Sequence, residues 1–210
     1  MKILIADDHA IVRKGLKQLL LEEYPSAKIE EVADGESLIT KVINEKWGVV
    51  ICDLDMPGRS GLDIMRQIKE IAPKLPVLIV SIYPEDQYAV RVLKAGAAGY
   101  VSKDAATEEL AKAVQRVSQG RKYISSSIAE IIAEDIGGNH NSDKAPHELL
   151  SDREFGVFKL IASGKSVSEI AERLSLSSAT VSTHRVRILT KMNMKTNAEL
   201  TRYALDNKLI

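Results

Sequence analysis

Polar side chains that can do chemistry follow several short apolar segments of this chain. Asp7 and Asp8 follow one such segment, Asp53 follows another, Ser81 ends a third and Lys103 follows a fourth. If these segments are parallel strands, their ends share one edge of a sheet, which would gather three carboxylates, a hydroxyl and an ammonium. Clustered carboxylates repel and need a cation, a shared proton or water. A hard divalent cation fits best, since Mg²⁺ binds one or two carboxylates together with water and phosphate oxygens.

This set of groups suits phosphoryl transfer. One carboxylate would attack phosphorus while the metal ion and Lys103 neutralise charge on the equatorial oxygens. Ser81 would donate a hydrogen bond to the phosphoryl group. Taken singly, each residue has a plainer explanation, such as a helix cap for Asp7 and Asp8 or a surface position for Lys103. Their joint occurrence at four strand ends favours the functional interpretation.

The surrounding segments alternate between two hydrophobic periods over residues 1–120. Short apolar runs at 2–6, 28–32, 48–53, 76–81 and 99–102 predict five strands. Apolar residues at three- and four-residue spacing predict helices over 11–22, 36–44, 62–71, 86–94 and 107–118. Alternating strands and helices, with central strands apolar on both faces, are typical of a parallel sheet covered on both sides. We therefore expect an α/β domain with a doubly wound, flavodoxin-like, five-stranded parallel sheet.

The rest of the chain predicts a linker and a small all-α domain. A short helix is expected over 128–136, followed by GGNHNSDKAPHE, which is dominated by turn-forming residues. Helices are then expected over 152–162, 167–174, 179–192 and 198–207, with residues 175–178 as the turn and cap of a helix-turn-helix. The predicted domains are thus 1–120, a linker with a short helix at 121–147, and 148–210.

The last domain is basic although the whole chain has a net charge of zero. Residues 148–210 hold ten basic and seven acidic residues, and 177–195 hold four basic residues and no acid. Within the helix expected at 179–192, Val181, His184, Ile188 and Met192 form one stripe that should pack on the domain core. The remaining positions suit a helix laid in the major groove of DNA. We expect base readout by Ser182, Thr183 and Val186 and phosphate contacts by Arg185, Arg187 and Lys191.

The motifs of residues 1–120 resemble the receiver domain of bacterial response regulators. The resemblance rests on Asp7-Asp8, on the DLDMPG motif at 53–58, on Ser81 and on the GAAGYVSK motif at 96–103. It implies that Asp53 is the phosphoacceptor and that Asp8 and Asp53 bind Mg²⁺ with the backbone carbonyl of Asp55. It further implies that Asp7 supports the metal indirectly, through water for instance. Ser81 and Tyr100 correspond to the switch pair that responds to phosphorylation, and Lys103 contacts the phosphate.

Residues 148–200 resemble the DNA-binding domain of the LuxR/FixJ class, and both halves together resemble the NarL family of response regulators. The matching segments are LSDRE at 150–154, IASGKS at 161–166, EIA at 169–171, and Leu174, Ser177, Thr180-Val181 and His184. Ser182 and Val167 depart from residues common in that family. The resemblance implies a non-enzymatic regulator whose phosphorylation by a sensor histidine kinase controls sequence-specific binding to double-stranded DNA. It also implies a homodimer when the protein is phosphorylated or bound to DNA.

Two other functions stay open on the sequence alone. One is a phosphohydrolase of the haloacid dehalogenase type, but Asp53-Leu54-Asp55 follows the third strand rather than the first, and the chain lacks room for a cap. The other is a receiver fused to a helical protein-interaction module. No apolar run approaches the roughly 18 residues of a membrane span. Together with the single cysteine, Cys52, this leads us to expect a cytoplasmic protein with no membrane partner.

Overall fold

A computed structural model describes residues 1–56, 61–137, 145–174 and 176–210. Outside these residues lie Pro57 and Gly58 of the DLDMPG motif, most of the GGNHNSDKAPHE segment, and Ser175 of the predicted turn. The chain divides into two compact units, Met1–Gly138 and Asn139–Ile210, and each is described separately below.

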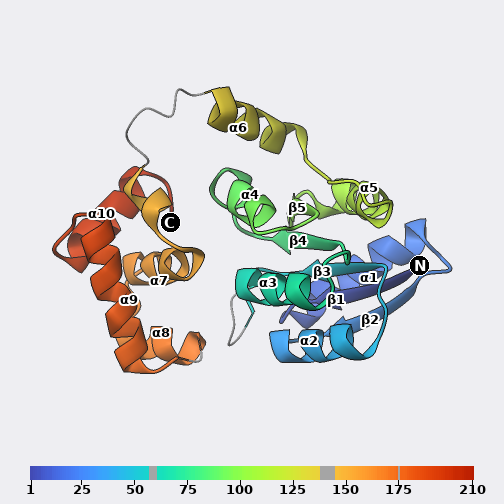
Figure 1. Cartoon of the computed structure of the whole chain (residues 1–210), viewed down its shortest axis with the longest axis horizontal. Helices are drawn as coiled ribbons and strands as arrows, with labels where there is room; N and C mark the ends of the chain where they lie inside the picture. Colours follow the sequence, from blue (N-terminus) through green and yellow to red (C-terminus); the bar gives the residue numbers. More distant parts are fainter. Residues whose placement is uncertain (57–60, 138–144, 175) are drawn as a thin grey trace. The chain divides into compact units, whose positions relative to one another are not determined.

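The first unit contains the predicted five-stranded parallel sheet (Figure 1). Its strands are β1 (Lys2–Ala6), β2 (Lys28–Val32), β3 (Val49–Cys52), β4 (Val77–Ser81) and β5 (Gly99–Ser102). They lie in the order β2-β1-β3-β4-β5, and the register pairs Ala6 with Cys52 and Ser81 with Ser102. The carboxyl ends of four strands therefore meet at one edge, as the sequence predicted.

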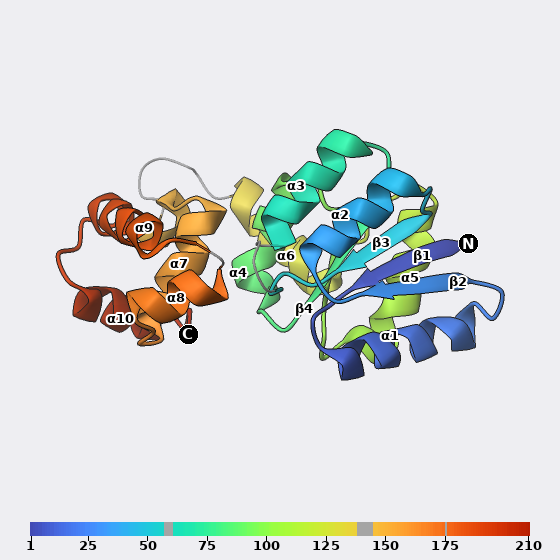
Figure 2. The same ribbon diagram turned by 90° about the horizontal axis from the view of Figure 1, so that it is seen from below.

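Five helices cover the two faces of this sheet. They are α1 (Ala10–Glu23), α2 (Gly35–Asn44), α3 (Gly61–Ile71), α4 (Glu85–Lys94) and α5 (Ala106–Ser118). The views in Figure 1 and Figure 2 place α1 and α5 on one face, and α2 and α3 on the other. Between the sheet and the α1/α5 layer lies a buried aliphatic core that includes Ile3, Ile51, Leu20 and Val114. Burial of these side chains provides the main driving force for folding and fixes the strand ends.

Gly61 begins α3 directly against the end of β3. A Cβ at this position would lie 2.5 Å from the carbonyl oxygen of Asp53 and 2.7 Å from the Cα of Leu54. Because both are backbone atoms, they cannot yield without moving Asp53. We expect Gly61→Ala to lower the free energy of unfolding by about 1–3 kcal/mol.

Gly15 supplies the matched control, since a Cβ there would have nothing within 4 Å. Gly15→Ala in the middle of α1 should raise the stability by about 0.5–1 kcal/mol. Urea denaturation of both variants measures the difference. Equal stabilities for the two would contradict the close approach at Gly61.

The segment after α5 returns to the edge of the sheet. The Tyr123 amide donates to the Ala98 carbonyl over 2.8 Å, and Tyr123 forms an isolated parallel bridge with Gly99. A Cβ on Gly99 would lie 2.8 Å from the Tyr123 carbonyl oxygen, so this approach requires glycine. Helix α6 (Ser126–Gly137) then packs against α4, with Ile128 fully buried.

The second unit is helical. It comprises a 3-10 turn, η1 (Pro146–Leu149), and the helices α7 (Asp152–Ala162), α8 (Val167–Arg173), α9 (Ser178–Lys191) and α10 (Asn197–Asp206). Local capping explains the boundaries: Ser151 and Ser166 each form a capping box with the glutamate three residues later. The Ser177 hydroxyl caps α9 by accepting from the Thr180 amide. Among the described residues, no helix has the length and apolar character that a membrane span requires.

Candidate functional site

Three carboxylates meet at the carboxyl edge of the sheet. Ligand atoms of Asp7, Asp8, His9 and Asp53 all lie within 4.8 Å of one another. The acidic cluster, defined as Asp7, Asp8 and Asp53, was predicted from the strand ends. That His9 belongs to this group was not predicted from the sequence, although His9 directly follows the two aspartates.

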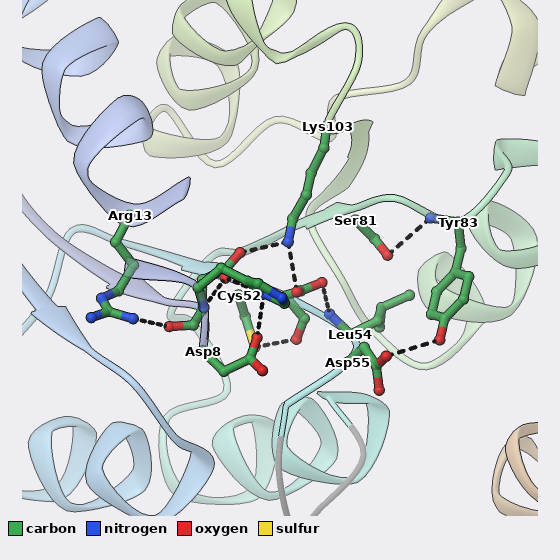
Figure 3. Close-up of polar contacts among 11 residues, drawn as sticks. Asp8, Arg13, Cys52, Leu54, Asp55, Ser81, Tyr83 and Lys103 are labelled. Carbon is green, nitrogen blue, oxygen red and sulfur yellow. Dashed lines mark hydrogen bonds and ion pairs between the residues drawn. The ribbon is translucent and has the colours of Figure 1, made fainter. Parts of the chain in front are cut away.

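Lys103 bridges two members of the acidic cluster (Figure 3). Its Nζ lies 2.6 Å from Asp7 Oδ2 and 2.7 Å from Asp53 Oδ2. Burial by itself would lower the pKa of Lys103, but its hydrogen bonds to Asp53 and Asp7 raise it above the ordinary value. The ammonium therefore remains charged and offsets part of the negative charge of the site.

One ammonium does not neutralise this site. Burial raises the pKa of Asp53 above its ordinary value even though Lys103 lowers it, and the charge of Asp7 adds to the rise. Both side chains are almost completely buried, with 1% exposure for Asp7 and 3% for Asp53. Ionised Asp53 is therefore destabilised here, and a further cation would relieve the repulsion.

Backbone groups fix the carboxylates in place. The His9 amide donates to Asp7 Oδ1 over 2.7 Å, and the Leu54 amide donates to Asp53 Oδ1 over 2.7 Å. The Asp53 amide in turn donates to the carbonyl of Ala6 over 2.9 Å, which ties β3 to β1. Asp7 and Asp53 thus each have one carboxylate oxygen held by a backbone amide.

The acidic cluster fits a hard divalent cation. Asp8 Oδ1 is buried without a hydrogen-bond donor, and its contact with His9 Nδ1 at 2.7 Å is an ion pair only when the imidazole is protonated. Carboxylate oxygens are the ligands that Mg²⁺ prefers in proteins. The cluster therefore has the donor set and the surplus negative charge typical of a magnesium site.

Tyr83 joins the predicted switch residues to the rim of the site, and sequence reasoning missed it. Its hydroxyl donates to Asp55 Oδ2 over 3.2 Å, and its amide donates to Ser81 Oγ over 3.3 Å (Figure 3). The Tyr100 hydroxyl donates to the Tyr83 carbonyl over 2.6 Å. The Tyr83 ring stacks on Tyr88 of α4 with centroids 4.6 Å apart. Contacts from Ser81, Tyr100 and α4 therefore converge on one loop residue.

Both predicted switch residues are buried. Ser81 and Tyr100 have no exposed surface. Burial raises the pKa of Tyr100 well above its ordinary value, although a hydrogen bond with Ser81 lowers it. The Tyr100 hydroxyl therefore remains protonated near neutral pH and acts as the donor to Tyr83.

The first turn of α4 contacts the segment that leads into α6. Glu85 lies in the first turn of α4, and its Oε2 accepts from the Ser125 hydroxyl over 3.0 Å and from the Ser127 hydroxyl. Ser125 is itself buried. The start of α6 is thus anchored to Glu85 of α4, which lies two residues after Tyr83 in the sequence.

In the second unit, α9 has the predicted division between a core stripe and an outer face. Val181, Ile188 and Met192 are buried, and His184 is half-buried beside them. Burial lowers the pKa of His184, and the positive charge of Arg153 lowers it further, so this imidazole is neutral at neutral pH. The α9 outer face, defined as Ser182, Thr183, Val186 and Arg187, is exposed.

Two predicted DNA contacts on α9 have partners within the domain. Lys191 Nζ lies 2.6 Å from Oε2 of the buried Glu154, and Arg185 Nε donates to Asn197 Oδ1 over 2.6 Å. Burial by itself would raise the pKa of Glu154, but the bonds from Lys191 and Ser151 lower it below the ordinary value. Lys191 therefore connects α9 to α7, and Arg185 connects α9 to α10.

Both units match known protein families. Residues 3–115 match the response regulator receiver domain, and residues 148–204 match the bacterial regulatory proteins of the luxR family. Over 215 residues the chain is 39% identical to the oxygen regulatory protein NreC of Staphylococcus carnosus, covering 100% of this chain and 99% of that protein. NreC of Staphylococcus aureus strain JH9 is 37% identical with the same coverage.

Solved structures of the RcsB response regulator of Salmonella typhimurium are also similar. One is 28% identical with a TM-score of 0.74, covering 97% of this chain and 96% of that one. Another, RcsB bound to promoter rprA in the presence of phosphomimetic BeF3-, is 29% identical with a TM-score of 0.67, covering 97% and 98%.

Proposed function

Since this chain belongs to the NarL-type response regulators, which join a receiver domain to a LuxR-type DNA-binding domain, we propose that phosphorylation of Asp53 controls its binding to DNA. Members of this family are transcription regulators rather than enzymes. The observation that carries the proposal is the bridge from Lys103 to Asp7 and Asp53 within a cluster of three carboxylates. It supports the proposal because a carboxylate that could act as a nucleophile lies beside a neutralising ammonium.

Each residue of the site has a distinct role in the proposed phosphorylation. Asp53 attacks the phosphorus of a donor, which is a phosphorylated sensor histidine kinase in the cell, and the leaving group departs with the P–N bond electrons. Asp8 and Asp53 with the Asp55 carbonyl would hold Mg²⁺, and Asp7 would support it indirectly. When bound, Mg²⁺ neutralises charge on the phosphoryl oxygens. Lys103 contacts the phosphoryl group, and Ser81 donates a hydrogen bond to it.

The response travels through the loop after β4. Phosphorylation adds about two negative charges at Asp53. A shift of Ser81 toward that charge changes its contact with Tyr83, which also touches Tyr100 and α4. The bonds from Ser125 and Ser127 to Glu85 carry the change from α4 to α6. The DNA-binding domain follows α6 along the chain, so a shift at α6 alters the population that is able to bind DNA.

DNA contact is assigned to α9. Ser182, Thr183 and Val186 on the outer face are proposed to read base edges, and Arg187 to contact a phosphate, with Arg185 and Lys191 at the flanks. Structures of RcsB include complexes with DNA and two RcsB dimers bound to two parallel DNAs. By this similarity we propose that the present chain also binds double-stranded DNA as a homodimer.

Acetyl phosphate tests both halves of the proposal. Wild-type protein treated with acetyl phosphate and Mg²⁺ should gain the mass of one phosphoryl group, and EDTA should prevent the gain because the acidic cluster needs a cation. Its affinity for a duplex selected from a random-sequence pool should change after treatment. An unchanged mass contradicts phosphorylation, and a mass gain with unaltered affinity contradicts the coupling. A protein that binds no duplex would favour the protein-interaction alternative.

A further inference from the structure

We propose that Asn197, at the start of α10, is a positioning residue that holds Arg185 for contact with a DNA phosphate. The inference rests on the proposed function and deepens it by assigning different roles to two cations of α9. It starts from the short bond between Arg185 Nε and Asn197 Oδ1, which is 2.6 Å long.

The donor chemistry of arginine fixes the orientation of both groups. Because Nε–H only donates, the oxygen of the Asn197 amide must face it. The bond occupies one of the five N–H donors of the guanidinium and leaves the two terminal amino groups as a planar fork. Such a fork matches two oxygens of a phosphate, which an ammonium contacts only as a point charge.

Arg185 and Lys191 differ in the charge of the residue that each one contacts. Lys191 is paired with the carboxylate of Glu154, whose exposure is 4%, so its charge is neutralised within the domain. Asn197 is uncharged, so its bond to Arg185 orients the guanidinium without cancelling its charge. Arg185 therefore keeps full attraction for a polyanion, whereas Lys191 serves mainly to join α9 to α7.

Asn197 lies on a well-fixed element. The Thr196 hydroxyl accepts from the Glu199 amide over 3.2 Å, and Glu199 Oε2 accepts from the Lys195 amide over 2.8 Å. The following turn is anchored by Leu200, which is fully buried. A long arginine side chain loses much rotamer freedom when it is fixed at an interface, and a partner on a rigid helix reduces that loss at the time of binding.

A double-mutant cycle on the full-length protein tests this role. The variants are Arg185→Ala, Asn197→Ala, the pair together, and Asn197→Asp. Affinity for the duplex selected from the random pool is measured by fluorescence anisotropy over a series of KCl concentrations. We expect Asn197→Ala to weaken binding by about 3- to 10-fold in the wild-type background and to have no effect when Arg185 is already alanine.

The salt dependence gives a readout that a merely structural role would not change. Arg185→Ala should reduce the magnitude of the salt slope by about one, since one phosphate contact is lost. Asn197→Ala should leave the slope near that of the wild type because the charge remains. Asn197→Asp keeps an acceptor for Nε but neutralises the guanidinium, so its slope should fall as in Arg185→Ala.

Several results would overturn the proposal. Equal losses from Asn197→Ala in both backgrounds would show that Asn197 acts on the fold of α10, as would a matching drop in urea stability. Unchanged affinity in Arg185→Ala would remove the phosphate contact. A wild-type protein that binds no duplex would refute the proposed function, and this inference with it.

Discussion

Asp53→Asn is expected to take up no phosphoryl group from acetyl phosphate and to bind DNA with the same affinity before and after treatment. The amide keeps the shape of the carboxylate but is not a nucleophile. The variant should remain folded, because burial raises the pKa of Asp53 and an uncharged group at this position avoids the desolvation of a carboxylate. Lys103 also retains its contact with Asp7. Intact mass and duplex affinity give the two measurements.

Asp104→Asn is the matched control for this experiment. Asp104 is exposed and directly follows Lys103 in the sequence. Its substitution replaces a carboxylate with an amide, as Asp53→Asn does, at a position near the site. It should take up one phosphoryl group as the wild type does. If Asp53→Asn were still phosphorylated, the assignment of the nucleophile would be wrong, and a failure of both variants would point to a general sensitivity to charge.

Arg187→Glu is expected to weaken duplex affinity by roughly 100-fold, with a salt slope smaller in magnitude by at least about one. Arg187 lies on the exposed α9 outer face, in a stretch from residue 177 to 195 that contains no acid. A carboxylate there would face the phosphates of the duplex and repel them. Anisotropy titrations at several KCl concentrations measure both quantities.

The control is the same charge reversal on α10. Arg202 is 85% exposed in its side chain and forms an i,i+4 pair with Asp206, away from the start of that helix. Arg202→Glu changes the net charge of the protein by the same amount but should weaken binding only slightly. Similar losses in the two variants would mean that overall charge, rather than the α9 outer face, governs DNA binding.

Hydrophobic period and strand-end chemistry were sufficient to predict the fold and the acidic cluster. The bounds of β1, β2 and β5 agree with the predicted ranges. Helices α1 to α5 each begin one residue earlier than predicted, and α6 begins two residues earlier. Helix α2 begins at Gly35 and α3 begins at Gly61. Glycine has a low helix propensity, so the sequence predicted that both residues lie outside a helix. Contact with neighbouring elements at these two positions overrides the local preference.

Contacts that depend on tertiary structure were not predictable in this way. Tyr83 lies in a loop, where hydrophobic periodicity cannot indicate which residues make contacts. Its contacts with Asp55 and Tyr88 therefore form only when β3, β4 and α4 are assembled. On α9, helical geometry placed Arg185 and Lys191 at the edges of the core stripe. Their partners are on other helices, so sequence spacing did not distinguish a neutralised cation from an oriented one.

The bridge between Tyr123 and Gly99 has a consequence for how the receiver is produced as a fragment. As the outermost strand, β5 would present unpaired backbone groups of the kind that recruit other chains and promote aggregation. The stretch around Tyr123 covers that strand, and the buried side chain of Ile128 packs α6 against α4. A fragment cut at residue 120 would lose both protections, whereas one that keeps α6 to Gly137 retains them, so the expression boundary belongs after α6.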